Sequence, residues 1–176
     1  MTRSMTSDYL QGFRYHVIAR MDGERNDPLQ PKTLGNSNNH GAQAGFQSVT
    51  IPEISVEASE YREGIFKWTE KYPGVPTVSD ITLIRGVVKD DTVFHDMVMK
   101  SIEGIKYRCD VDIYQYHRSE MTPDVGNVGV PGSRIITCHE CFATRAKPNG
   151  DLDSTAGDIS LSEIDLCMEW FELKSE

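Results

Sequence analysis

Apolar and polar side chains alternate along much of the chain, and this spacing places successive side chains on opposite faces of a β-strand. In residues 13–20 the alternation puts Phe13, Tyr15, Val17 and Ala19 on one side. The same pattern, rich in β-branched and aromatic residues, predicts about seven strands, at 13–20, 46–61, 61–72, 80–88, 105–116, 134–143 and 159–173.

Prolines and glycines interrupt the alternation at two places. Its phase changes around Pro52, which predicts a bulge because proline cannot donate to a central ladder. Gly64 is expected to form a turn, and Pro73, Gly74 and Pro76 are expected to break the chain before the next strand.

The last segment, 159–173, is predicted to be one long strand with two distinct faces. Its apolar face consists of Ile164, Leu166, Met168 and Trp170. The opposite face consists of Glu163, Asp165, Cys167 and Glu169.

One segment, 92–102, has the spacing of an amphipathic helix instead. Its apolar stripe consists of Val93, Phe94, Met97 and Val98. Either Asp91 or Thr92 can cap its N-terminus, and Gly104 can end it.

Polar residues without periodicity predict loops at 21–44, 119–132 and 147–157. The long first loop either reaches a neighbouring subunit or is a surface insertion. The strands and the helix together predict a mainly β fold, an antiparallel β-sandwich or barrel of about seven strands with one short α-helix. We expect one domain over residues 1–176, with its core at about 13–173.

The charge balance argues against a nucleic-acid-binding protein. With 27 acidic and 18 basic residues the net charge is −9, whereas a nucleic-acid interface needs a basic surface. The acidity either repels nucleic acid in a conduit or serves solubility. No segment approaches the roughly 20 apolar residues of a membrane helix, and residues 1–11 lack a secretory apolar run. We therefore expect assembly in the cytoplasm and no membrane insertion.

Four cysteines are present, Cys109, Cys138, Cys141 and Cys167. Cys138 and Cys141 form a CxxC, but no second ligand pair for zinc accompanies it. Because residues three apart in a strand point to opposite faces, these two thiols are not expected to converge. They are interpreted as ordinary strand cysteines, unless oxidising surroundings pair thiols between subunits.

No nucleophile, metal-protease, P-loop or dinucleotide motif occurs in the sequence. The protein is therefore predicted not to be an enzyme, with no catalytic residue, no cofactor and no metal site. The remaining classes are a structural subunit and a small β-sandwich binding or adaptor module.

A set of short motifs in the central part of the chain resembles the contractile tail tube protein family. The motif residues are Tyr61, Arg62, Gly64, Pro73, Gly74, Thr82, Leu83, Arg85 and Gly86. The tubes of extracellular contractile injection systems, such as the antifeeding prophage and the Photorhabdus virulence cassette, are especially similar. The fold is also similar to the haemolysin-coregulated protein of type VI secretion.

The resemblance implies a structural inner-tube subunit of a contractile phage tail or of an injection particle, and an injection particle of this kind is released outside the cell. Subunits of this family form stacked hexameric rings around a channel for DNA or protein cargo. The implied partners are further copies of the chain, a sheath protein, baseplate and tube-initiator proteins, and a tape-measure or cargo protein. The alternative is a tube-initiating baseplate or adaptor protein of the same particle.

Assembly into a head-to-tail ring requires two different open sheet edges, and 46–61 is a candidate edge strand. Arg62 and Arg85 are interpreted either as pairing with acidic residues across subunits, or as being solvated or paired locally. Gly64, Gly74 and Gly86 are interpreted as turns or as close backbone contacts. Three acidic residues are candidates for a surface that faces the lumen or the sheath, Glu163, Asp165 and Glu169, and Asp110 with Asp112 is a second candidate; a solvated outer face is the alternative.

Overall fold

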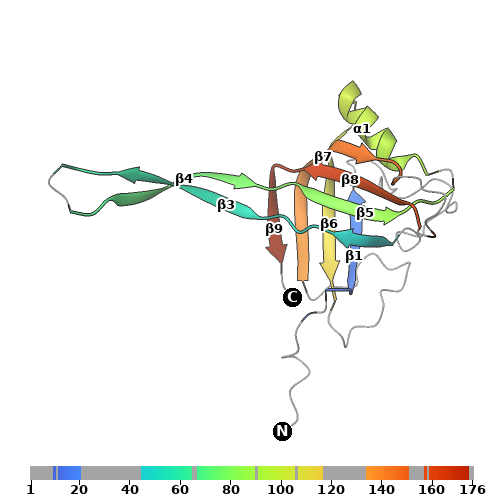
Figure 1. Ribbon diagram of the computed structural model, residues 1–176, viewed down its shortest axis with the longest axis horizontal. Coiled ribbons are helices and arrows are strands. Elements are labelled where there is room, and N and C mark those ends of the chain that lie inside the picture. Colours follow the sequence, from blue (N-terminus) through green and yellow to red (C-terminus); the bar gives the residue numbers. More distant parts are fainter. Residues whose placement is uncertain are drawn as a thin grey trace, which may run out of the picture.

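The structure is a computed structural model that describes residues 10, 12–20, 45–64, 67–89, 91–105, 107–116, 134–150, 157 and 159–174. The predicted loops at 21–44 and 119–132, and most of 147–157, lie outside these residues. The described part contains nine strands and one helix (Figure 1): β1 (Tyr15–Arg20), β2 (Phe46–Val49), β3 (Ile54–Tyr61), β4 (Glu70–Val78), β5 (Ile81–Gly86), α1 (Val93–Glu103), β6 (Cys109–Gln115), β7 (Arg134–Lys147), β8 (Leu161–Cys167) and β9 (Trp170–Lys174).

Seven of the strands form one sheet, and all their pairings are antiparallel. The order is β1-β6-β7-β8-β5-β2, and β9 pairs with β7 beside this path. The remaining strands, β3 and β4, pair only with each other. The predicted mainly β, antiparallel fold with one helix is confirmed.

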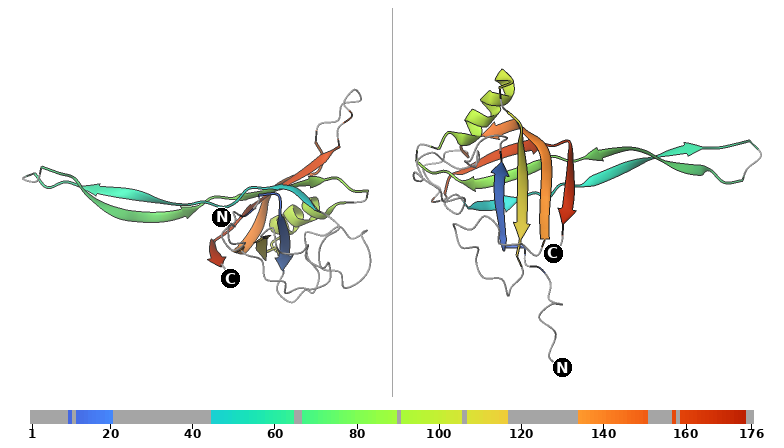
Figure 2. Two further views of the ribbon diagram at one scale, coloured as in Figure 1. Left: turned by 90° about the horizontal axis from the view of Figure 1, so that it is seen from below. Right: turned by 180° about the vertical axis from the view of Figure 1, so that it is seen from behind.

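β7 holds the sheet together because it takes part in both of its halves. Its first part, residues 134–139, lies between β6 and β9, and its second part pairs with β8 from Phe142 onward. Between the two parts, Glu140 has a positive φ of 54°. β1, β6 and β9 therefore run in a different direction from β8, β5 and β2 (Figures 1 and 2).

The apolar side chains between these two halves form a single core. The strands contribute Val17, Ala19, Ile81, Leu83, Cys109, Val111, Ile113, Ile136, Cys138, Cys141, Ala143, Ile164, Leu166 and Met168. α1 adds Val93, Phe94 and Met97 and packs against β7 and β8. The predicted apolar stripe of the helix thus faces the core, and Gly104 ends the helix in the left-handed conformation.

The structure corrects several predicted boundaries. Of the expected strand 61–72, only Tyr61 in β3 and residues 70–72 in β4 lie in strands. The expected strand 46–61 is two strands, because the chain leaves the sheet around the buried Pro52. Pro73, Gly74 and Pro76 do not break the chain; they lie inside β4. Since β4 pairs on one side only, a proline there can point its nitrogen away from the ladder.

The expected long strand 159–173 is also two strands. β8 pairs with the second half of β7 and with β5, whereas β9 pairs with the first half of β7. Met168 remains on the core face, but Trp170 is exposed and lies beyond the corner. Among the described helices, none is long and apolar enough to cross a membrane.

Candidate assembly surfaces

β3 and β4 form a two-stranded arm that projects from the body of the protein (Figures 1 and 2). Every residue of β3 is exposed. Cross-strand contacts support the arm internally: the Ser55 and Thr77 hydroxyls lie 2.7 Å apart, and Lys71 pairs with Glu60 at 3.1 Å. An isolated two-stranded hairpin is only marginally stable in water.

A bulge in β3 sets the shape of the arm. The register shifts between Val56 and Ala58, and Gly74 of β4 lies against the bulged Glu57. A Cβ on Gly74 would lie 2.6 Å from the Glu57 carbonyl oxygen. Gly74 is therefore required for the two backbones to approach, whereas a Cβ on Gly64 would meet nothing within 4 Å and one on Gly86 only an ordinary contact.

The arm carries large apolar side chains that nothing within the described residues buries. This arm patch consists of Ile54, Val56, Tyr61, Trp68, Tyr72 and Val75. Trp68, close to the tip, is 79% exposed. Aromatic side chains in such positions are typical of protein–protein interfaces.

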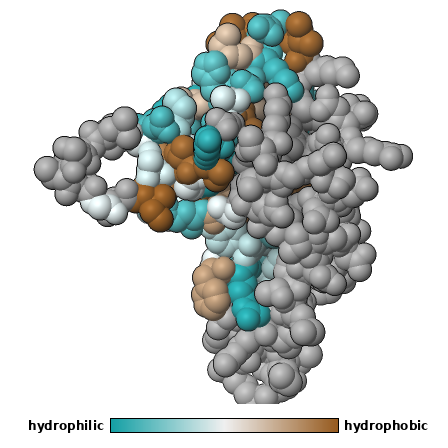
Figure 3. All heavy atoms as spheres, turned by 90° about the vertical axis from the view of Figure 1, so that its right-hand side faces the viewer, coloured by the Kyte–Doolittle hydropathy of each residue, from teal (hydrophilic) through white to brown (hydrophobic). Residues whose placement is uncertain are grey.

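A second apolar surface lies at the end of α1 and is named the helix-end patch. Its exposed members are Met99, Ile102 and Ile105, and it borders a shallow hollow lined by Tyr107 and Phe142. Figure 3 shows apolar side chains at the free end of the helix, at the top of the view. The arm and the end of α1 lie on different parts of the molecule (Figure 1).

Arg85 anchors the start of α1 to the sheet. Its guanidinium donates to both carboxylate oxygens of Asp91, at 2.7 and 2.6 Å, and lies 4.1 Å from the centre of the Phe94 ring. The Arg85 and Asp91 side chains are 1% and 4% exposed. Of the two predicted roles for Arg85, the geometry therefore matches the local pair, whereas Arg62 is exposed near the tip of the arm.

The three acidic residues predicted for the lumen or the sheath each lie close to an arginine. Glu163 and Asp165, on the outer face of β8, accept hydrogen bonds from Arg145 at 2.7 and 2.6 Å, and the pairing raises the pKa of Arg145. Glu169 contacts Arg108. Arg145 is shared by two carboxylates, and Arg108 is shared by Glu169 and Glu140, so each arginine offsets one of the two negative charges it contacts.

The second candidate acidic pair is held within the body of the protein. Asp112 is buried and lies 2.6 Å from Arg20, so it contributes little to an acidic surface. Asp110 faces the corner of β7, where it contacts the neighbouring strand.

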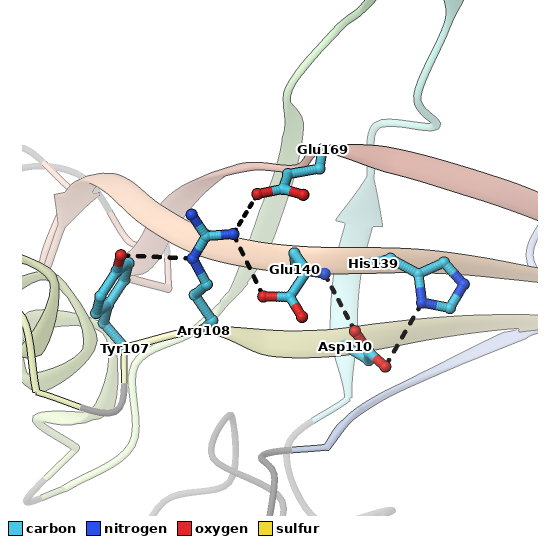
Figure 4. A network of polar contacts seen from close by, with 6 residues as sticks. All are labelled: Tyr107, Arg108, Asp110, His139, Glu140 and Glu169. Atoms are coloured by element: carbon cyan, nitrogen blue, oxygen red, sulfur yellow. Dashed lines mark hydrogen bonds and ion pairs between the residues drawn. The ribbon is translucent and has the colours of Figure 1, made fainter.

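A polar network covers the corner of β7 on the face away from the core (Figure 4). The Glu140 amide donates to Asp110 Oδ1 at 3.1 Å, and Arg108 contacts both Glu140 and Glu169. The His139 imidazole also lies near Asp110, with Nδ1 3.6 Å from Oδ2. These contacts join the starts of β6 and β9 to β7 around Glu140, the residue with the positive φ.

His139 makes a further contact with β9. Its ring stacks on the indole of Trp170, with ring centres 4.0 Å apart. The first residue of β9 is thereby fixed beside the corner.

On the core side of the same corner, the structure corrects the prediction for the cysteines. Cys138 and Cys141 are both fully buried. The extra residue at Glu140 turns the strand between them, so both side chains point inward. All four cysteines are described, and none forms a disulfide.

The predicted motif residues are divided between two places. Tyr61, Arg62 and Gly64 lie near the tip of the arm and Pro73 and Gly74 in β4, whereas Thr82, Leu83, Arg85 and Gly86 lie in β5 of the body.

The sequence did not predict Asp91 as the partner of Arg85, although its place before the helix was a usable signal. It also missed Trp68 and the clustering at Glu140. Among the described residues, no group of three His, Cys, Asp or Glu side chains is arranged to hold a metal ion.

Known protein families and structures resemble this chain over nearly its whole length. The family model for the T4-like virus tail tube protein gp19 matches residues 13–172. Comparison with curated proteins gives no match.

Three solved structures illustrate the likeness in fold. A chain in the sheath–tube complex of the extracellular contractile injection system PVC, in its extended state, has a TM-score of 0.73 and 19% identity over 100% of both chains. A chain in the baseplate of the anti-feeding prophage has a TM-score of 0.72 and 14% identity over 96% of this chain and 97% of that one. Hcp1 from Salmonella typhimurium has a TM-score of 0.53 and 10% identity over 93% and 87%.

Proposed function

Because the chain belongs to the T4-like virus tail tube protein family, we propose that it is the inner-tube subunit of a contractile phage tail or phage-tail-like injection system. Copies of the chain form hexameric rings, and the rings stack around a channel that conducts DNA or protein cargo. The role is structural, and it requires no catalytic group or cofactor.

The arm is the observation that carries this proposal. A head-to-tail contact joins two different surfaces of identical subunits, and the chain offers two separate apolar surfaces, the arm patch and the helix-end patch. Contact with a neighbouring copy buries the arm, which the body of its own chain leaves exposed. It also covers the open edges of β3 and β4, which would otherwise invite aggregation.

The other partners follow from the same role. The outer surface of the tube contacts a sheath protein, its ends contact baseplate and initiator proteins, and its lumen holds a tape-measure or cargo protein. Glu163, Asp165 and Glu169 face either the lumen or the sheath as arginine-paired side chains. Such a surface keeps a net negative charge, so it does not bind the phosphates of a passing DNA.

The proposal is tested by negative-stain electron microscopy and mass photometry of the full chain over a wide concentration range. We expect rings or hollow rods with six-fold layers. Trp68→Ser removes an arm side chain and should weaken assembly at least about tenfold, because aromatic anchors carry much of the energy of an interface. Ile159→Ser is the matched control, since Ile159 is also 79% exposed but lies outside the arm.

Each alternative gives a distinct result in the same experiment. A strictly monomeric particle at every concentration would contradict self-assembly. Closed rings that never stack would favour the second candidate, a tube-initiating baseplate or adaptor protein, which is consistent with the likeness in fold to a chain of the anti-feeding prophage baseplate.

A further inference from the structure

The chain leaves β7 through a short Pro-Asn-Gly segment, residues 148–150, which directly follows the last strand residue, Lys147. Asn149 is exposed and Gly150 is half-buried, and neither lies in a strand or a helix. Within the described part of the chain, neither residue takes part in a hydrogen bond. No described contact therefore restrains the Asn149 amide or the Gly150 N–H.

The residue that follows Asn149 distinguishes it from every other asparagine of the chain. Six asparagines are present, and only Asn149 precedes a glycine. The others precede Asp27, Ser37, Asn39, His40 and Val128. A side chain on the following residue hinders the approach of its backbone nitrogen to the asparagine side chain, whereas glycine has no Cβ and reaches more backbone conformations. The Gly150 nitrogen is therefore the backbone nitrogen best able to reach an asparagine side chain.

We propose that Asn149 is a site of spontaneous deamidation, for which water is the only other reactant. The Gly150 nitrogen loses its proton and attacks Cγ of Asn149. A C–N bond forms, the bond between Cγ and Nδ2 breaks, and Nδ2 leaves as ammonia. Water then opens the five-membered succinimide ring at one of its two carbonyl groups. One water is consumed and one ammonia released, and the product is an aspartate or an isoaspartate at position 149.

The position of the segment at the end of a ladder allows this ring to close. The pairing of β7 with β8 ends at Lys147 and Glu163, so a bend at residues 148–150 breaks no ladder pair. The Gly150 backbone lies beside the first residue of β8, since a Cβ at position 150 would be 3.6 Å from the Leu161 carbonyl oxygen. The reaction therefore takes place at the edge of the fold, outside its hydrogen-bonded sheet.

Deamidation changes the charge and the backbone at one exposed place. Either product adds a carboxylate to a chain whose net charge is already −9. The isoaspartate also inserts an extra CH₂ group into the main chain directly before Gly150. Since no enzyme takes part, the converted fraction grows with the age of the chain. This inference is independent of tube formation, because both reacting groups belong to one chain.

The test is peptide mapping of the full chain after ageing in neutral and in alkaline buffer. Glutamyl endopeptidase cleaves after Glu140 and Glu163 and releases residues 141–163, in which Asn149 is the only asparagine. We expect this peptide to gain the mass difference between O and NH at least about tenfold faster than the peptides with the other asparagines. Alkaline buffer should accelerate the change, because the Gly150 nitrogen must lose its proton. A 141–163 peptide that keeps its mass, or that changes no faster than the others, would overturn the proposal.

A second digestion tests the ring mechanism. Endopeptidase Asp-N cleaves before an ordinary aspartate at position 149 but not before an isoaspartate. Opening of the ring at either carbonyl predicts a mixture, so part of the converted peptide should resist this cleavage. A product that is cleaved completely would indicate direct hydrolysis of the side chain and would contradict the attack by Gly150.

Gly150→Ala is the variant that separates the proposed reaction from general ageing. Its Cβ would lie 3.6 and 3.7 Å from the Leu161 carbonyl oxygen and nitrogen, which are ordinary contacts, so the variant should fold like the wild type. Conversion at Asn149 should fall at least about tenfold, since the new methyl group hinders ring closure. Asn149→Gln is the second control, and its 141–163 peptide should keep its mass because ring closure from the longer side chain is slower. Equal conversion in the wild type and Gly150→Ala would overturn the proposal.

Discussion

Arg85 links the strand motif to the helix through a buried ion pair. A buried charge that loses its partner is strongly destabilising, because its desolvation is no longer compensated. The pair with Asp91 and the contact with Phe94 therefore determine how α1 begins on the sheet.

Arg85→Ala should lower the free energy of unfolding by about 3–5 kcal/mol, since it leaves the Asp91 carboxylate buried without its guanidinium. Urea unfolding followed by circular dichroism measures the change. Arg62→Ala is the control, and this exposed arginine should change stability by less than about 0.5 kcal/mol. Equal effects of the two substitutions would show that the buried pair is not a major source of stability.

His16 should make the protein less stable in mild acid. Burial lowers the pKa of His16 below its ordinary value of 6.5. Below pH 6.5 the unfolded chain gains a proton that the folded chain takes up only at lower pH, so the free energy of unfolding falls as the pH drops. Once the pH is below the pKa of His16 in the folded chain, protonation of His16 lowers the free energy of unfolding no further.

The measurement for this second prediction is Tm as a function of pH, between about pH 7.5 and 5.5. The wild type should lose more Tm over this window than His16→Gln, which cannot take up the proton. Parallel curves for the two proteins would rule out His16 as the source.

At the scale of elements, alternation predicted the strands well wherever one face of a regular strand meets the core. β5 alternates buried and half-buried residues along its whole length, and α1 follows its apolar stripe and its glycine stop. The same reasoning failed at Glu140, because a positive φ at a non-glycine residue leaves no mark in the pattern. The cysteine prediction failed with it, since the direction of a side chain depends on the register of every residue before it.

The arm was hidden from the sequence for a different reason. Pro73 and Pro76 indicate a break under rules that apply to central strands, whereas β4 pairs on one side only. β3 also alternates, with Ile54, Val56 and Ala58 at every second position, but the body of its own chain covers neither face. A strand with both faces left uncovered by its own chain cannot be located by the rules for an internal core.

Gly74→Ala should distort the arm and leave the body intact. The new Cβ would lie 2.6 Å from the Glu57 carbonyl oxygen, so the two strands must separate at the bulge. We expect a destabilisation of the arm of about 1–3 kcal/mol and loss of assembly, with an unchanged Tm of the body. Mass photometry follows assembly, and thermal circular dichroism follows the Tm of the body. Normal assembly of the variant would contradict the conclusion that the β3 and β4 backbones can approach only with a glycine at position 74.

Gly64→Ala is the matched control for this substitution. It adds the same methyl group near the tip of the arm, where no atom lies within 4 Å. This variant should assemble like the wild type.

At the scale of the whole molecule, the body should fold without the arm. β3 and β4 pair only with each other, and neither strand contributes a fully buried core residue. Val78 at the end of β4 packs against the core and is kept in the variant below. Replacing residues 57–75 with Asn-Gly would join the paired residues Val56 and Pro76 through a short hairpin turn. We expect a monomer whose Tm stays within about 3 °C of the wild type. Rings formed by this variant would show that assembly uses other surfaces.

The two strands of the arm continue directly into the body, since β3 follows β2 and β4 leads into β5 (Figure 1). A neighbour that holds the arm therefore pulls on β5 along its own axis. β2 and β5 are drawn together, because both lead into the arm, and the load passes to the rest of the sheet through the ladder between β5 and β8. Such a pull loads that ladder in shear, so its bonds must give way together. The subunit is thus strongest against tension in the direction of the arm, and a force across that direction would separate the bonds one at a time.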